Sequence, residues 1–288
     1  MVSGKLLVIA TPLGNLEDIS PRAVEALRQA DLILCEDTRR TARLLDRYGI
    51  EKPRLSYHRF NERQRLDQVL QDLREGRNLA LVSDGGTPAI SDPGFMLVRA
   101  VLDEGLDISP IPGPSAAATL LSVSGFPAGR YLFEGFLPHR GGERRRRLRQ
   151  LRGEPHTIVL FEAPHRIVAT LRDIAEIFGK RELVLGRELT KKFETILAGS
   201  ADELSERLGD EVKGEITLAI AGAPPGEEAG DEDARAESVR EGWRRALQEA
   251  GGDRRAALRA AAKTLGLKRP ELYRLLAELG EDPDGRMR

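Results

Sequence analysis

Residues 78–94 read Asn-Leu-Ala-Leu-Val-Ser-Asp-Gly-Gly-Thr-Pro-Ala-Ile-Ser-Asp-Pro-Gly. The apolar run at 79–82 is typical of a buried strand, and it ends in a loop with two glycines and a proline. In open parallel sheets, ligands bind where strands deliver their carboxyl ends. Gly85 and Gly86 let the backbone approach a ligand closely, and Asp84 offers a hydrogen-bond acceptor. Taken alone, this loop fits a ligand site and an ordinary turn about equally well.

Two further strands end in the same manner. The predicted strand at 5–10 runs into Thr11-Pro12-Leu13-Gly14-Asn15-Leu16, and the one at 107–111 runs into Pro112-Gly113-Pro114-Ser115-Ala116. Three such loops favour a shared pocket over three ordinary turns. Neither a G-x-G-x-x-G fingerprint with its acidic ribose contact nor a G-x-x-x-x-G-K-[ST] loop is present, so the pattern argues against a nicotinamide dinucleotide or a nucleoside triphosphate.

Strand and helix patterns alternate along most of the chain, which indicates an α/β fold. In the first half this alternation predicts a mainly parallel sheet with helices on both faces. The second half predicts a mixed sheet, because two strands follow each other after Arg187 before the next helix. A helix near 114–124 is expected to join the two α/β subdomains, with the pocket in the crevice between them.

These patterns predict four regions. An N-terminal α/β subdomain at 1–113 is followed by a second at 114–222, an acidic linker rich in Gly and Pro at 223–234, and a small helical domain at 235–288. The last region resembles a helix-turn-helix, since Gly-containing turns separate short helices. A three-helix bundle used only for docking or dimerisation fits this region equally well.

Six motifs follow one another along the chain: Pro12-Leu13-Gly14-Asn15-Leu16, Ser83-Asp84-Gly85-Gly86-Thr87-Pro88, Pro112-Gly113-Pro114-Ser115-Ala116, Phe136-Leu137-Pro138, Glu162-Ala163-Pro164-His165-Arg166 and Arg187-Glu188-Leu189-Thr190-Lys191. In these motifs and their order the chain resembles ribosomal RNA small subunit methyltransferase I, a family of 2′-O-methyltransferases in the tetrapyrrole methylase superfamily. The resemblance covers residues 5–222. One departure is Ala163, where the family usually has serine.

The resemblance implies S-adenosylmethionine as methyl donor, bound in the cleft. The small residues of the three loops suit it, because they let backbone amides and carbonyls reach the ligand. Phe161 is expected to pack on the adenine, although a phenylalanine in a strand is more often simply core. The predicted cofactor residues are Pro12, Leu13, Gly14, Asp84, Gly85, Gly86, Thr87, Ser115, Ala116 and Phe161.

A ribose hydroxyl is a poor nucleophile, so a base or a cationic neighbour would assist the transfer. Four polar residues at predicted strand ends are candidates for this catalytic role: Asp37, His165, Glu188 and Lys191. Ordinary structural roles compete with it, namely a helix N-cap for Asp37 and an ion pair for Glu188 with Lys191. No residue stands out from sequence as the base.

The formal net charge is −1, but the charges are unevenly distributed, and residues 140–152 contain seven arginines and one glutamate. Local patches rather than net charge decide phosphate binding, although a charge run is more often a solvated helix face. A tyrosine beside cations in the last predicted helix also suits RNA. The predicted RNA-binding residues are Arg39, Arg144, Arg145, Arg146, Arg147, Arg166, Lys268, Arg269 and Tyr273.

Composition limits the remaining possibilities. No apolar stretch is long enough to span a bilayer, and no signal peptide is expected, so a cytoplasmic protein is predicted. The single cysteine, Cys35, excludes an internal disulfide, and the scattered histidines predict no metal site.

Three functions compete. The leading one, implied by the resemblance, is methylation of a cytidine 2′-oxygen of 16S rRNA in the decoding centre by a homodimeric enzyme. The others are methylation of a small tetrapyrrole-like metabolite and non-enzymatic binding to the ribosome. The arginine run and helical tail favour RNA over a porphyrinoid.

Overall fold

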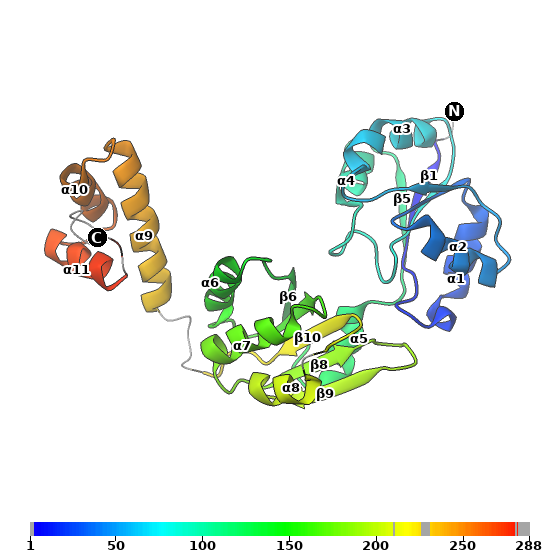
Figure 1. The fold of residues 1–288 in the computed structure, drawn as a ribbon. Coiled ribbons are helices and arrows are strands. Elements are labelled where there is room, and N and C mark those ends of the chain that lie inside the picture. The colour runs from blue at the N-terminus through cyan, green and yellow to red at the C-terminus, as the bar shows by residue number, and fades with distance from the viewer. Residues whose placement is uncertain (1–2, 210, 226–230, 280, 282–288) are drawn as a thin grey trace. The chain divides into compact units, whose positions relative to one another are not determined.

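The computed structural model describes residues 3–209, 211–225, 231–279 and 281 (Figure 1). The chain divides into two compact units. The first unit contains both β-sheets and comprises Met1–Leu137, His156–Ala175 and Gly179–Ala221. The second comprises Pro138–Pro155, Glu176–Phe178 and Gly222–Arg288.

Five parallel strands form the first sheet, in the order β3-β2-β4-β1-β5. Helices α1 (Pro21–Gln29) and α2 (Thr38–Arg47) share one apolar core with it, and α3 (Glu62–Arg74) and α4 (Phe95–Asp103) share a second. The predicted parallel sheet with two covered faces is therefore confirmed. The strands are β1 (Lys5–Ile9), β2 (Leu32–Cys35), β3 (Arg54–Ser56), β4 (Leu79–Leu81) and β5 (Asp107–Ile111).

The second sheet is mixed, as predicted, with the order β6-β7-β10-β8-β9. Only the β6–β7 pair is parallel, and the other three pairs are antiparallel. Helix α5 (Ala116–Ser124) packs on this sheet through Leu120 and Leu121. The strands are β6 (Tyr131–Phe136), β7 (Thr157–Glu162), β8 (Leu183–Arg187), β9 (Thr195–Gly199) and β10 (Ile216–Ile220), and the other helices are α7 (Ile167–Phe178) and α8 (Ala201–Leu208).

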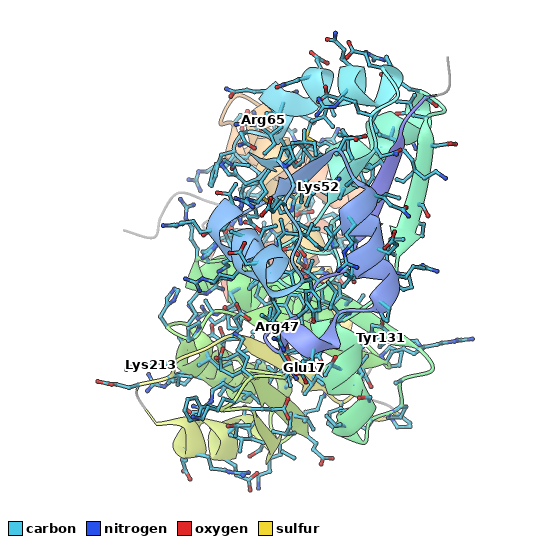
Figure 2. The ribbon with its side chains drawn as sticks, turned by 90° about the vertical axis from the view of Figure 1, so that its right-hand side faces the viewer. Glu17, Arg47, Lys52, Arg65, Tyr131 and Lys213 are labelled. Atoms are coloured by element: carbon cyan, nitrogen blue, oxygen red, sulfur yellow. The ribbon has the colours of Figure 1, made fainter. Side chains whose placement is uncertain are left out.

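Charged side chains of both signs, among them Glu17, Arg47 and Lys52, lie on the side of the first unit shown in Figure 2. Arg47 at the end of α2 forms an ion pair of 3.8 Å with Glu17 in the short 3₁₀ helix Leu16–Asp18. Both side chains are more than half exposed, so the pair contributes little to stability. The fold is held by the buried strands instead.

The second unit is helical and differs from the predicted division of the chain. Its helices are α6 (Gly141–Leu151), α9 (Asp231–Glu249), α10 (Arg254–Thr264) and α11 (Arg269–Glu278). The arginine-rich α6 was assigned from sequence to the second α/β subdomain, but it packs with α9 of the tail. The acidic linker is also shorter than predicted, because α9 begins at Asp231; residues 226–230 of the expected linker lie outside the described residues.

The tail forms its own apolar core. Trp243 of α9 is 2% exposed, and it packs among side chains of α10 and α11. On α11, Leu272 and Leu276 face this core and are fully buried against Leu258 and its neighbours. Among the described residues, no helix is both long and apolar enough to cross a membrane.

Candidate active site

The loops after β1, β4 and β5 meet, as the sequence predicts. The backbones of Thr11 and Gly86 exchange two hydrogen bonds of 2.8 and 2.9 Å. The Thr11 hydroxyl donates to the carbonyl of Ser83, and the Thr87 hydroxyl donates to the carbonyl of Pro114. The carboxyl ends of three neighbouring strands are thereby tied into one structure.

A cavity of about 360 Å³ lies at this junction, within the first unit. Parts of both sheets line it: the loop after β4, the first residues of α5, the ends of β6 and β7, and the start of β10. Eight of the ten predicted cofactor residues line the cavity, namely Leu13, Asp84, Gly85, Gly86, Thr87, Ser115, Ala116 and Phe161.

The other two predicted cofactor residues, Pro12 and Gly14, lie beside the cavity rather than in its lining. The carbonyl oxygen of Pro12 is 3.2 Å from where a Cβ on Gly85 would stand. A Cβ on Gly14 would come within 2.1 Å of Cγ of Lys191, so this glycine makes room for the lysine stem. Both positions therefore serve packing of the loops around the cavity.

The loop between β4 and α4 has an unusual backbone. Ala89 and Ser91 both have positive φ values, 66° and 63°, and Gly86 and Gly94 have φ values of 95° and 124°. Left-handed non-glycine residues are uncommon, cost free energy and gather at functional sites. The backbone of Gly94 is held by Glu62, which accepts a hydrogen bond from its N–H at 3.2 Å. This loop is therefore a shaped element rather than a simple connection.

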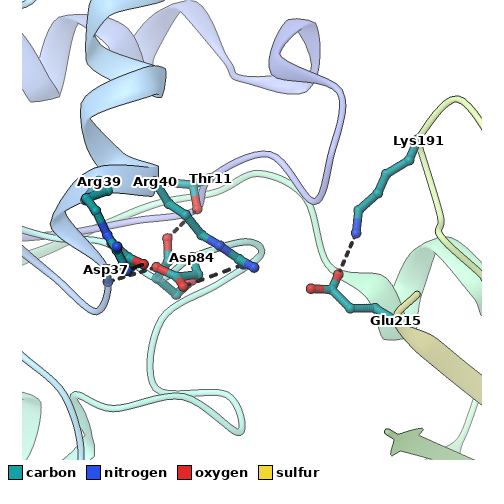
Figure 3. Close-up of polar contacts among 8 residues, drawn as sticks. Thr11, Asp37, Arg39, Arg40, Asp84, Lys191 and Glu215 are labelled. Carbon is teal, nitrogen blue, oxygen red and sulfur yellow. Dashed lines mark hydrogen bonds and ion pairs between the residues drawn. The ribbon is translucent and has the colours of Figure 1, made fainter. Parts of the chain in front are cut away.

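Asp84 and Asp92 bring two carboxylates into the cavity. Asp84 accepts a hydrogen bond of 3.0 Å from the backbone N–H of Asp37 and lies 3.5 Å from the guanidinium of Arg40 (Figure 3). Burial raises the pKa of Asp84, and the neighbouring charge of Asp37 acts in the same direction, although the N–H of Asp37 and the cation of Arg40 oppose both. Asp84 is thus anchored on one side and open to the cavity on the other.

Asp92 was not singled out from sequence. Burial and then the negative charge of Glu36 raise the pKa of its carboxyl to about 6, against a hydrogen bond with Ser83. Burial also raises the pKa of Glu36, which comes directly after β2. The only sequence signal for Asp92 is its place in Ser91-Asp92-Pro93-Gly94, the end of the stretch at 78–94.

Glu188 and Lys191 form an ion triad with Glu215 at the edge of the site. Nζ of Lys191 is 2.8 Å from Oε1 of Glu188. It also lies 3.0 Å from Oε2 of Glu215, which lines the cavity, and Figure 3 shows this second contact. Partial burial acts to raise the pKa of Glu188, but the hydrogen bond from Lys191, the one from the N–H of Glu215 and the neighbouring cations together lower it. Burial opposes the charge of Lys191, but both carboxylates raise its pKa. These contacts favour a structural ion pair of Glu188 with Lys191 over a catalytic role for either residue.

Asp37 and His165 also stand apart from the cavity. Asp37 is the N-cap of α2, as the competing interpretation held, and its side chain accepts a hydrogen bond of 2.8 Å from the N–H of Arg39. That bond and a side-chain bond from Arg39 lower the pKa of Asp37. His165 is exposed. None of the four predicted catalytic residues is among the described residues that line the cavity.

Burial argues against two of the predicted RNA contacts. Arg166 is 8% exposed, lies 3.2 Å from Glu162 and donates to the carbonyl of Leu137. Arg144 is 7% exposed within α6. One side of α6 is buried, and Arg144 lies on that side with Leu148 and Leu151. A run of arginines in the sequence therefore does not place all of them on the surface.

The remaining predicted RNA-binding residues are arranged in different ways. In α6, Arg146 pairs with Glu241 of α9 at 2.7 Å and Arg147 donates to Gln150, while Arg145 is half-buried. The other four are exposed: Arg39 on α2, and Lys268, Arg269 and Tyr273 at and within α11. Among the described residues, no group of three or more His, Cys, Asp or Glu side chains is arranged to hold a metal ion.

Comparisons with known proteins agree with this architecture. Residues 5–205 match the family model of the tetrapyrrole (corrin/porphyrin) methylases. Among solved structures, a cobalt precorrin-4 methyltransferase aligns with a TM-score of 0.57 and 20% identity, covering 75% of this chain and 94% of its own. A diphthine synthase aligns with a TM-score of 0.59 and 16% identity, covering 76% of this chain and 90% of its own. At such identities the likeness shows the fold.

Curated relatives are much more similar in sequence. Ribosomal RNA small subunit methyltransferase I of Thermotoga maritima is 48% identical over 76% of this chain and 99% of its own length. The protein of that name from Xylella fastidiosa (strain Temecula1) is 45% identical over 94% and 98%, and that from Synechocystis sp. is 42% identical over 97% and 99%. The chain therefore belongs to the tetrapyrrole methylases and, within them, to the family of ribosomal RNA small subunit methyltransferase I.

Proposed function

We propose that this protein transfers a methyl group from S-adenosylmethionine to the 2′-oxygen of a cytidine in the decoding centre of 16S rRNA. The observation that carries the proposal is the identity of 42–48% to relatives named as small-subunit rRNA methyltransferases, in the Synechocystis case over 97% of the chain including the helical tail. Methylases of this family use S-adenosylmethionine, so the cofactor follows from membership.

The cavity fits this cofactor. Its volume of about 360 Å³ lies in the usual range for small-molecule sites, roughly 300–1,000 Å³. The backbone at Gly85 and Gly86 is left open by the missing side chains, and a Cβ at Gly85 would stand 3.2 Å from the carbonyl oxygen of Pro12. Asp84, Asp92 and Glu215 give the lining a negative character that suits a cationic ligand. When bound, S-adenosylmethionine supplies an electrophilic methyl group on a sulfonium.

Asp92 is the residue best placed to accept the proton of the ribose hydroxyl. It lines the cavity, and a carboxylate with a pKa of about 6 is ionised at neutral pH yet more basic than an ordinary aspartate. Catalytic bases work best when their pKa approaches the working pH. Proton removal at the 2′-oxygen, together with alignment of that oxygen by the cavity walls, accounts for the chain's part in the reaction.

Cations near the cavity suit the phosphates that accompany the target nucleotide. Arg40 lines the cavity and its side chain is 57% exposed, so its guanidinium reaches solvent while one side meets Asp84. Arg39 is more exposed still, at 88% of its side chain. We assign further phosphate contacts to Lys268 and Arg269 of the tail, with Tyr273 as a stacking residue. A cytoplasmic homodimer completes the proposal.

The test uses small ribosomal subunits isolated from cells that lack this methylation. The protein is incubated with these particles and isotope-labelled S-adenosylmethionine, and the label is mapped by nuclease digestion and mass spectrometry. The proposal expects one labelled cytidine carrying a 2′-O-methyl group in the decoding centre. Label on a base, at another site, or only on an added porphyrinoid would contradict it. Particle binding without label would support the non-enzymatic alternative.

A further inference from the structure

Strand β6 contains a bulge that changes the direction of one aromatic side chain. Its pairing with β7 shifts register between Phe133 and Gly135. In a regular strand, residues three apart point to opposite faces of the sheet. Here the extra residue places both Phe133 and Phe136 against the ring of Phe161, with centroid distances of 5.0 and 5.7 Å and interplanar angles of 70° and 65°. The bulge therefore turns Phe136 toward the cavity.

The bulge fits the strained loop after β4. Gly135 has a φ of +69°, and a Cβ there would lie 2.8 Å from the hydroxyl of Ser91, so any other residue would strain the backbone and displace that hydroxyl. Ser91 also has a positive φ. Two left-handed residues thus meet where the loop touches β6, and bulges beside active sites commonly serve to re-aim a side chain.

Two large apolar side chains next to this contact are exposed to solvent. Ile90 precedes Ser91 and is 47% exposed, and Phe136 follows Gly135 and is 54% exposed. Both line the cavity. The strand end behind Phe136 is fixed, because the buried Arg166 donates a 3.0 Å hydrogen bond to the carbonyl of Leu137. A rigidly held, half-exposed ring in a cavity is suited to a flat ligand.

The two ligands of the proposed reaction each contain a flat group. The small and polar groups suited to the cofactor come from the strand-end loops of the first sheet and from the start of α5. Phe136 comes instead from β6, the edge strand of the second sheet. Asp92 lies two residues beyond Ile90 in the same loop and lines the same cavity as Ile90 and Phe136.

We propose that Phe136, together with Ile90, is the platform on which the unpaired base of the target nucleotide stacks. Specific recognition of RNA uses unstacked bases placed on aromatic side chains, and a base that is attached to a reacting ribose must be held still while the 2′-oxygen is aligned. The buried pair of Glu162 and Arg166 then acts as a positioning element for this platform rather than as an RNA contact. The inference rests on the proposed function, since it requires an RNA substrate.

The test compares Phe136→Ala and Phe136→Tyr with Phe60→Ala in the full chain. Phe60 is 84% exposed and is not part of the cavity lining, so it controls for the loss of an exposed phenylalanine. Base stacking on an aromatic side chain predicts a loss in kcat/KM for undermethylated small subunits on the order of 10-fold or more in Phe136→Ala. Phe136→Tyr keeps the flat ring and is expected to stay near wild type, as is Phe60→Ala.

Calorimetry with S-adenosylmethionine in the absence of RNA separates the two flat ligands. The inference expects Phe136→Ala to bind the cofactor like wild type and to show the same circular dichroism. Weaker cofactor binding in that variant would assign the ring to the adenine and overturn the inference, as would methylation rates equal to those of Phe60→Ala. Absence of methylation by the wild type would instead reject the proposed function itself.

Discussion

Two loops of the first unit are built alike but present their carboxylates in opposite ways. The loop after β4 contains Ala89 and Ser91 with positive φ, and the loop after β8 contains Glu188 and Thr190 with positive φ. In the first loop, burial and neighbouring acids raise the pKa of Asp92; in the second, Lys191 lowers the pKa of Glu188. Strand-end position and backbone strain therefore do not identify a catalytic acid or base, whereas the neighbouring charges distinguish the two.

The largest effect is expected from filling the cavity beside the first loop. Gly85→Leu places a Cβ 3.2 Å from the carbonyl oxygen of Pro12 and extends a side chain into the space proposed for the cofactor. Binding of S-adenosylmethionine should be lost while circular dichroism stays native, because the new side chain occupies the cavity and this loop does not belong to an apolar core. Calorimetry measures this directly, and near-normal affinity would remove the loop from the cofactor site.

Removal of the proposed proton acceptor should have the next largest effect. Asp92→Asn keeps the size of the side chain but cannot take up the proton of the 2′-hydroxyl, so kcat should fall by about 10²- to 10⁴-fold, the usual contribution of a general base. Affinity for S-adenosylmethionine should change much less than kcat. Asp37→Asn is the matched control, since Asp37 caps a helix outside the cavity lining. Equal losses in the two variants would reject the role of Asp92.

The second loop should respond in stability more than in rate. Lys191→Met keeps the aliphatic stem that packs against Gly14 but removes the charge shared by Glu188 and Glu215. The free energy of unfolding at pH 7 should decrease by about 1 kcal/mol or less, because the pair is partly exposed to solvent. Since the pKa of Glu188 is lowered in the folded state, this stabilisation is present above its unfolded pKa and disappears as pH falls through the folded pKa.

Urea unfolding of Lys191→Met at neutral and at strongly acidic pH provides the measurement. The difference from wild type should shrink at acidic pH, while methylation at neutral pH stays close to wild type. A large loss of kcat without a loss of stability would restore the catalytic role that the sequence predicts for Glu188 and Lys191.

The smallest effect concerns the strain itself. Left-handed conformations cost an alanine roughly 1 kcal/mol, so Ala89→Gly should raise the free energy of unfolding by up to about 0.5 kcal/mol after the greater freedom of glycine in the unfolded chain is subtracted. Thr190→Gly relieves the same strain but loses the hydroxyl that accepts a hydrogen bond from the N–H of Asn15 at 3.2 Å, so it should not stabilise. Denaturant unfolding compares the two, and equal changes would show that the loops do not differ in this respect.

Sequence patterns predicted the parts of the site that depend on local chain chemistry. Apolar runs ending in Gly and Pro located the strand-end loops, and eight predicted cofactor residues line one cavity. Asp92 carries no local signal, because its raised pKa comes first from burial and then from Glu36, which lies 56 positions earlier and is brought near by the pairing of β2 with β4. Glu215 carries no local signal either, since its contact with Lys191 joins residues 24 positions apart that meet through the pairing of β8 with β10.

Charge runs were interpreted less accurately from sequence. Nothing in the sequence distinguishes Arg144 and Arg166 from exposed arginines, and only the packing of the folded chain shows that both are buried. The assignment of α6 failed similarly, because Arg146 pairs with Glu241, 95 residues later. The only sequence signal for the bulge in β6 is Gly135, and a single glycine does not show which side chain the bulge directs toward the cavity.

We infer that the carboxylate in the loop after β4, and not the one after β8, takes the proton of the substrate. The most direct test is the pH dependence of kcat/KM, which reports ionisations of the free enzyme, for wild type, Asp92→Asn and Glu188→Gln. Asp92 must be ionised to act, so kcat/KM of the wild type should rise with pH through about 6 and then level off. Glu188→Gln should keep this rise, and Asp92→Asn should lose it and stay low throughout. A rise that persists in Asp92→Asn, or one that vanishes in Glu188→Gln, would contradict the claim.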